Sequence, residues 1–226
     1  MTTNTAGQVR EEAEPPPSGL SALKLRRRPL QRRGQVTFNR VLDAAEQILL
    51  ERGILALTTN LIAARSGVNI SSIYKFFPNK HSVVLALFER HLKIRIDHVR
   101  DAVLAISEAH DWRPALDVAI ERSYEARQLA PSTIVVLRAM LSSQELYEVD
   151  QATRGELATL FASALRSWAA VDEERIHLAA RCLVETSIAL LNFWQSTGPD
   201  KDPRIVEEAK TMARSYLAAY LRHPPR

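Results

Sequence analysis

The chain has 226 residues, of which 46% are hydrophobic and 25% are charged, and its formal net charge is +4. These values are ordinary for a soluble globular protein of one or two domains. No apolar run approaches the roughly 18 residues of a membrane span, and the polar, proline-rich N-terminus does not resemble a signal peptide. A single cysteine, Cys182, excludes an internal disulfide, and its apolar flanks predict a buried thiol rather than a reactive site. We therefore expect a cytoplasmic protein with no membrane partner.

The residue types favour helices throughout the chain. Glycine is scarce, with seven residues, whereas alanine, leucine, arginine and glutamate are abundant. We therefore predict an all-α protein.

Basic residues are concentrated toward the N-terminus. Residues 24–80 carry eleven lysines and arginines against three acidic residues, a net charge of +8. From residue 81 onward there are 18 basic and 20 acidic residues, a net charge of −2. This segregation favours a polyanion-binding module joined to a near-neutral second part, over the alternative of a merely solvated charged surface.

Residues 1–35 are predicted to be a disordered basic arm. Three consecutive prolines at 15–17 interrupt any helix, and the basic stretch that follows has no helical apolar stripe. Such an arm can lie along phosphates or in a minor groove, and a merely solubilising tail is the alternative. The arginines expected to make these contacts are Arg26, Arg27, Arg28, Arg32 and Arg33.

Three helices are predicted after the arm, in a pattern typical of a helix-turn-helix. The first runs over 37–52, where apolar residues recur at helical spacing. Two short helices follow within 58–77, with Thr58 and Asn69 as their N-caps and Gly67 at the turn between them. The side chains expected to form the core of this unit are Ile62, Val68, Ile73 and Phe77.

A helix-turn-helix places its second helix in the major groove, where base edges present a distinguishable pattern of donors and acceptors. Here that helix supplies short polar groups, a tyrosine and a lysine. The N-termini of the first short helix and of the next long helix suit phosphates. The predicted DNA contacts are Thr58, Thr59, Asn60, Asn69, Ser71, Ser72, Tyr74, Lys75 and Lys80.

The rest of the chain is predicted to be a bundle of long helices. A helix over 80–107 carries one apolar stripe that includes His91 and His98. We interpret both histidines as packing residues rather than metal ligands, because no nearby cysteine or glutamate completes a ligand set, and we expect no metal or cofactor. Further helices are predicted over 112–129, 131–145, 147–170, 172–197 and 202–222. The last two are apolar over more than one face, which favours a homodimer interface over a central position within a monomer.

Residues 37–88, and above all the segment TTNLIAARSGVNISSIYKFFPNK, resemble the N-terminal domain of TetR-type bacterial transcription regulators. The matching residues are Ala44, Ala45, Gly53, Thr58, Ile62, Ala63, Gly67, Val68, Ile73, Tyr74, Phe77 and Lys80. Two positions depart from the family pattern, in which polar or charged residues often stand where this chain has Leu61 and Ile70. Ile70 either contacts a thymine methyl group or faces a neighbouring side chain.

The resemblance implies an all-α homodimer with a helix-turn-helix DNA-binding domain at 36–80 and an effector-binding and dimerisation domain at 81–226. Its two recognition helices would lie roughly 34–36 Å apart on a palindromic operator. Effector binding would favour a conformation whose spacing misfits the operator, so that a repressor is released.

We expect a small hydrophobic effector, because the C-terminal helices carry many apolar and amphipathic side chains, although such residues also fill helical cores. The candidate lining residues are Trp112, Tyr124, Leu137, Met140, Leu141, Phe161, Trp168, Phe193 and Trp194. A regulator controlled by a protein partner, with no small effector, is the alternative. An all-α enzyme is disfavoured, because the sequence has no GxSxG or HExxH motif and no phosphate-cradling glycine loop.

Overall fold

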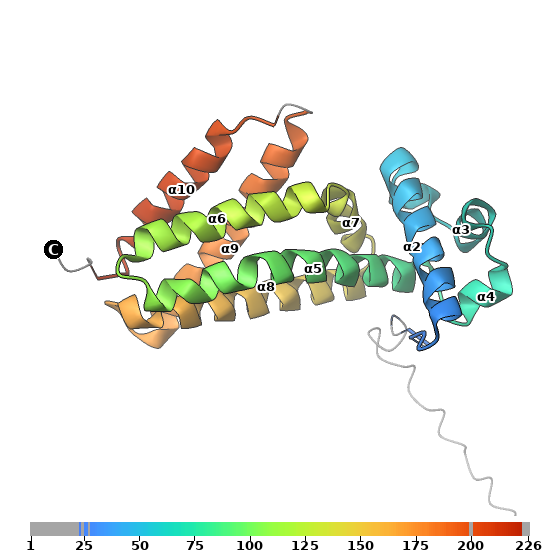
Figure 1. Cartoon of the computed structure of the whole chain (residues 1–226), viewed down its shortest axis with the longest axis horizontal. Helices are drawn as coiled ribbons and strands as arrows, with labels where there is room; N and C mark the ends of the chain where they lie inside the picture. The colour runs from blue at the N-terminus through green and yellow to red at the C-terminus, as the bar shows by residue number, and fades with distance from the viewer. Residues whose placement is uncertain (1–22, 24, 27, 199–200, 223–226) are drawn as a thin grey trace, which may run out of the picture.

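The structure is a computed structural model that describes residues 23, 25–26, 28–198 and 201–222. Its long helices, labelled as in Figure 1, are α2 (Arg32–Arg52), α5 (Lys80–Leu104), α6 (Trp112–Leu129), α8 (Gln144–Leu165), α9 (Glu173–Ser196) and α10 (Arg204–Leu217). The shorter ones are α3 (Thr59–Ser66), α4 (Ile70–Tyr74) and α7 (Thr133–Met140), with 3-10 turns η1 (Ile54–Ala56), η2 (Ala105–Glu108) and η3 (Arg166–Trp168). The described residues contain no strand, apart from an isolated bridge between Ala169 and Leu221, so the predicted all-α class is confirmed.

The helices form a small head and a longer body (Figure 1). The head consists of α2, α3 and α4. α5 begins at the head and runs along the body beside α6 and α8. α9 packs on α8, and α10 packs on α6 and α9. The last described residues lie at the end of the body that is remote from the head (Figure 1).

Two groups of buried side chains hold these parts together. The head core joins α2, α3 and α4 to the first half of α5 and to α7, through side chains such as Val41, Ile62, Phe88 and Met140. The body core joins the rest of α5 to α6, α8, α9 and α10. The head core therefore crosses the expected domain boundary at residue 80, because the first half of α5 and α7 both pack on α2.

The chain that precedes α2 differs from the predicted disordered arm where it is described. Residues 1–22 and Arg27 lie outside the described residues, and so does that part of the prediction. Leu23 is 3% exposed in the head core. The backbone N–H of Arg26 donates to the carbonyl of Phe76, just after α4, at 3.0 Å. The described end of the arm is therefore docked on the head.

α2 begins at Arg32 rather than at residue 37, which corrects the predicted extent of the arm. Its first turn is exposed and polar, so no apolar stripe marks it in the sequence, and it propagates from the anchored part of the helix. Gly34 allows the preceding chain to approach closely, because a Cβ at this position would lie 2.9 Å from the Cβ of Pro29.

The C-terminal helices follow the predicted order. Two of them end earlier than predicted, one because the next helix is capped and one because the chain reverses direction. The helix predicted over 131–145 ends at Met140, because the side chain of Ser143 caps α8. The helix predicted over 202–222 ends at Leu217, after which the chain turns back and forms backbone hydrogen bonds to the segment after α8.

α9 contradicts the prediction of a buried cysteine, because Cys182 lies exposed on it. The apolar residues of α9 cover more than the face that packs on the body, and Leu178 and Phe193 are 52% and 57% exposed. By length and composition alone, α9 is apolar enough to cross a membrane. It nevertheless carries an ion pair between Arg181 and Glu185 and packs on α8 and α10. Exposed apolar surface on such a bundle helix is typical of a protein–protein contact.

Candidate nucleic-acid interface and ligand cavity

The core of the helix-turn-helix forms as predicted. The four predicted core side chains are all buried, namely Ile62, Val68, Ile73 and Phe77. Phe77 stacks on Phe38 of α2 with ring centroids 4.7 Å apart, which fixes the end of α4 against α2. Gly67 ends α3 in the left-handed region, at φ +64°, where a side chain would be strained, and so allows the tight turn into α4.

Polar side chains define where the helices of this unit begin. The Oγ1 atom of Thr58 accepts from a backbone N–H of α3 at 3.1 Å, and the Oδ1 atom of Asn69 accepts from the N–H of Ser71 at 2.9 Å. Both predicted N-caps are therefore confirmed. Asn79 and Ser82 form a reciprocal capping box at the start of α5. The caps therefore fix the residues at which α3, α4 and α5 begin.

The exposed edge of α3 and α4 carries the polar groups that are predicted to meet DNA. Tyr74 is 40% exposed, and Lys75 next to it is exposed. The hydroxyl of Thr59 lies 3.1 Å from the hydroxyl of Tyr74, so the two helices share one polar edge. Ile70 is half-buried. Among the remaining predicted contacts, the exposed ones are Thr58, Asn60, Asn69 and Ser71, and the half-buried ones are Ser72 and Lys80.

The described arginines of the arm lie in three different settings. The guanidinium of Arg26 donates to a carbonyl at the end of α4 at 3.4 Å, beside the polar edge. Arg28 pairs with Glu89 of α5 at 2.5 Å. Arg32 and Arg33 are exposed in the first turn of α2, where cations oppose the helix dipole and no acidic residue offsets them. This placement disfavours the isolated helix and suits pairing with an external anion.

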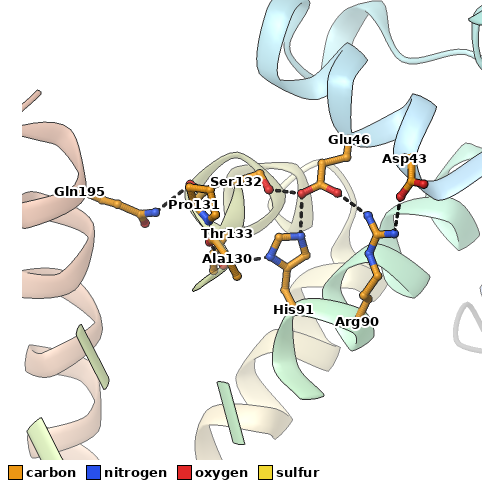
Figure 2. A network of polar contacts seen from close by, with 9 residues as sticks. All are labelled: Asp43, Glu46, Arg90, His91, Ala130, Pro131, Ser132, Thr133 and Gln195. Carbon is orange, nitrogen blue, oxygen red and sulfur yellow. Dashed lines mark hydrogen bonds and ion pairs between the residues drawn. The ribbon is translucent and has the colours of Figure 1, made fainter. Parts of the chain in front are cut away.

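A polar junction ties the head to the body (Figure 2). The carboxylate of Glu46 on α2 accepts from the hydroxyl of Ser132, just before α7, and from the guanidinium of Arg90 on α5. Its Oε1 atom lies 3.0 Å from Nε2 of His91, whose Nδ1 atom lies 2.9 Å from the hydroxyl of Thr133. His91 is 3% exposed, which agrees with the interpretation of this histidine as a packing residue.

The junction strongly favours the ionised form of Glu46. The hydrogen bond from His91 contributes most and lowers the pKa of Glu46 to about 2, with further contributions from Ser132 and from the charge of Arg90. Burial acts in the opposite direction and is outweighed. The carboxylate therefore joins three helices as a charged acceptor.

A cavity of about 100 Å³ lies inside the body, between α5, α6, α8 and α9. Two of the predicted lining residues, Tyr124 and Phe161, belong to its wall. Most of the wall is aliphatic, with side chains such as Leu92, Ile96, Val99, Leu116, Leu160 and Leu183. An apolar cavity with a small number of polar groups is typical of a small-molecule site.

The other seven predicted lining residues lie outside this wall, and four of them belong to the head core or the surface. Leu137 and Met140 pack in the head core, because α7 covers α2 rather than the cavity. Leu141 and Phe193 are 65% and 57% exposed.

The three tryptophans of the predicted set also lie outside the cavity wall. Trp112 and Trp168 anchor the end of the body remote from the head, and their indole N–H groups donate to backbone carbonyls at 3.2 and 2.9 Å. Trp194 packs edge-on against Tyr124, with ring centroids 5.1 Å apart. Aromatic size alone did not distinguish packing residues from cavity residues.

Most lining residues of the cavity were not among the predicted site residues, and the charged residues Arg95 and Arg127 belong to those that were missed. A sequence signal for Arg127 exists, because it follows Leu116, Ile120 and Tyr124 at helical spacing and so belongs to an apolar stripe. A long charged side chain in such a stripe is usually expected to reach solvent. Its burial becomes evident when the opposing helices are known.

Comparisons with known proteins cover both parts of the chain. Residues 41–87 match the family described as bacterial regulatory proteins, tetR family, and residues 111–217 match the family described as tetracyclin repressor-like, C-terminal domain. The HTH-type transcriptional regulator BetI of Rhizobium meliloti (strain 1021) is 28% identical over 192 residues, which are 80% of this chain and 88% of BetI.

Solved structures have the same fold. A TetR-family transcriptional regulator from Streptomyces coelicolor is 28% identical, with a TM-score of 0.61 over 82% of this chain and 99% of its own. SmeT in complex with triclosan is 23% identical, with a TM-score of 0.65 over 83% of this chain and 93% of its own, a likeness of fold. SmeT is the repressor of a multidrug efflux pump of Stenotrophomonas maltophilia.

Proposed function

The chain belongs to the TetR family of bacterial transcriptional regulators, and on this premise we propose that it is a cytoplasmic repressor that binds a palindromic operator as a homodimer. A small hydrophobic effector that enters the body cavity releases it from the operator. The observation that best supports DNA binding is the polar edge formed by Thr59, Tyr74 and Lys75. This edge lies on helices that have a buried core and capped N-termini. Its role is regulatory rather than enzymatic.

The charges around this edge support an interface with phosphates. Lys75 is an exposed cation at the end of α4, and Arg26 lies beside it on the docked arm. Arg32 and Arg33 add two exposed cations at the start of α2. Contacts of this kind position a protein on the duplex, whereas the short polar groups of α4 read base edges.

We assign the dimer contact to α9 and α10. Leu178, Cys182, Ala189 and Phe193 recur at helical spacing and are exposed along one side of α9, and Met212 is 48% exposed on α10. A two-fold axis would place the same surface of a second copy against this stripe. Such a contact buries the apolar surface that the single chain leaves open.

The release step follows from the position of the cavity relative to the junction. α5 lines the cavity and also supplies Arg90 and His91 to the junction, and α6 leads directly into Ser132. An effector need only bind more tightly to a body conformation that shifts the junction. The head would then move with Glu46, and the spacing of the two recognition helices would misfit the operator.

The test is binding of the purified full-length protein to DNA from its own promoter region, followed by fluorescence anisotropy at several salt concentrations. We expect affinity at about the nanomolar level and a steep decrease with salt. Lys75→Ala removes one phosphate contact per subunit, so the slope of log affinity against log salt should become shallower by about 2.

The matched control is Lys93→Ala, which removes an exposed lysine of α5 that pairs with Asp97 at 2.8 Å. This variant should bind DNA as the unmodified protein does. If Lys75→Ala and Tyr74→Ala both fold and both bind DNA normally, α4 is not the recognition helix.

A regulator controlled by a protein partner remains the alternative, and the cavity favours the small effector. A thermal-shift assay against a set of hydrophobic small molecules separates the two. Stabilisation by at least one class of compound supports the effector, whereas no stabilisation together with specific capture of a protein partner supports the alternative.

A further inference from the structure

Two arginines, one buried and one half-buried, line the apolar cavity of the body. Arg127 on α6 is 0% exposed, and Arg95 on α5 lines the same cavity. A buried charge without a partner is costly, and replacing it with an apolar residue would usually stabilise a protein. Their presence in a wall that is otherwise largely aliphatic therefore calls for a functional reason.

The hydrogen bonds of this group are incomplete. Nη1 of Arg127 donates to Oε1 of Gln195 at 2.8 Å, but its Nε and Nη2 atoms have no partner among the described residues. The same holds for Nε of Arg95 and for the hydroxyl of Tyr124, which also lines the cavity. Four buried polar atoms, from three side chains that line the same cavity, thus have no hydrogen-bond partner among the described residues.

The charge of the group is also incomplete. No ion pair of Arg127 with a carboxylate is present among the described residues, and Asp150, which attracts Arg95, already pairs with Arg154 at 2.8 Å. Burial lowers the pKa of Arg127 to about 9 and that of Arg95 to about 10, so both remain charged at neutral pH. Burial raises the pKa of Tyr124 to about 12, so its hydroxyl remains a donor.

We propose that the cavity binds an amphipathic carboxylic acid, whose carboxylate is held by Arg127, Arg95 and the hydroxyl of Tyr124 while its apolar part lies against the aliphatic wall. The ligand supplies the missing negative charge and accepts the unused hydrogen bonds, which are strong when both partners are charged. This inference rests on the proposed function, since it names the chemical class of the hydrophobic effector.

The carboxylate site is also connected to the junction. The side chain of Gln195 accepts a hydrogen bond from Arg127. Its Nε2 atom donates to the carbonyl of Pro131 at 2.8 Å (Figure 2). The next residue, Ser132, donates to Glu46 of the head. A carboxylate that draws Arg127 away from Gln195 therefore acts on the segment that holds the head.

The test is isothermal titration calorimetry of the full-length protein with three probes of equal chain length: octanoate, 1-octanol and octylamine. Octanoate should bind at least about tenfold more tightly than 1-octanol, because charge-assisted hydrogen bonds are made only by the acid. Octylamine should not bind, because its ammonium group would be repelled by the positive charges of the two arginines.

Arg127→Gln should weaken octanoate binding by about tenfold or more and leave 1-octanol binding within about twofold. The matched control is Arg122→Gln, on the same helix but exposed and paired with Glu125, which should change neither. If circular dichroism shows that Arg127→Gln is unfolded, the binding of octanoate and 1-octanol is compared in the variants Arg95→Gln and Tyr124→Phe instead. Equal binding of octanoate and 1-octanol, or normal octanoate binding by the folded variants, overturns the proposal.

The outcome is separable from that of the proposed function. Salt-dependent promoter binding that requires Lys75, without octanoate binding, refutes the ligand class and leaves the regulator intact. Arginine-dependent octanoate binding without any promoter binding supports the carboxylate site and refutes the operator-binding role.

Discussion

Glu46 is the residue whose replacement tests the coupling of head and body most directly. Glu46→Gln removes the negative charge but keeps the size of the side chain and one carbonyl acceptor. In the structure this carboxylate contacts Ser132, Arg90 and His91 from two other parts of the chain (Figure 2). Its side chain is 19% exposed, so solvent screens these contacts only in part.

The pKa of Glu46 determines how much its replacement should change the free energy of unfolding. It falls from 4.5 to about 2 on folding, and each pKa unit corresponds to about 1.36 kcal/mol, so ionisation contributes about 3 kcal/mol to the free energy of unfolding. Because the folded-state pKa is depressed, this contribution is fully present above about pH 4.5 and is lost as the pH falls toward 2. Glu46→Gln should therefore lower the free energy of unfolding by up to about 3 kcal/mol at pH 7.

The assay is urea unfolding followed by circular dichroism at pH 7, 5, 4 and 3. The difference in unfolding free energy between the two proteins should be constant from pH 7 to 5 and should narrow at pH 4 and 3. The matched control is Asp43→Asn, which removes a carboxylate from the same helix and the same Arg90 but from a site that is 61% exposed. Asp43→Asn should lower the free energy of unfolding by less than about 1 kcal/mol. A Glu46→Gln difference that does not change with pH, or that is as small as the control, refutes the reasoning.

Three further predictions concern the arm, the dimer and the cavity. Leu23→Ala should lower the unfolding free energy by about 2–4 kcal/mol, because Leu23 is buried in the head core, whereas Leu30→Ala, at a site 85% exposed, should change it little in the same urea titration. Phe193→Asp should convert the dimer to monomers in sedimentation velocity, and Leu55→Asp, at a site 93% exposed on the head, should not; a dimeric Phe193→Asp protein would contradict the α9 interface. Arg127→Met should leave unchanged or raise the melting temperature of the unliganded protein, because it removes an unpaired buried charge, and a decrease of several degrees would show that the charge is already compensated.

The helix-turn-helix could be predicted because its signals are local. Thr58, Gly67 and Asn69 cap or turn the chain through bonds to residues two to four positions away, and these bonds are present in the structure. The burial of Ile62 and Ile73 beside less buried neighbours is likewise a property of helical periodicity. Such features depend on spacing along the chain rather than on tertiary packing.

The junction and the cavity could not be predicted in the same way, because their partners are distant in sequence. Glu46 and Ser132 are 86 positions apart, and Arg127 and Gln195 are 68 positions apart. Nothing local distinguishes Glu46 from a solvated glutamate of an amphipathic helix. The same limit explains why Leu137 and Phe193 were assigned to a pocket, since their apolar character does not say which helix they face.

The head core also determines when the head can reach its final packing during synthesis. Residues from α7, such as Val136 and Met140, complete a core whose other members lie mostly before residue 90. The segment between them, which contains most of α5 and all of α6, must leave the ribosome first. At about 5–20 residues per second this delays completion of the head by several seconds. The part of the chain that is translated first therefore reaches its final packing only after α7 has been made.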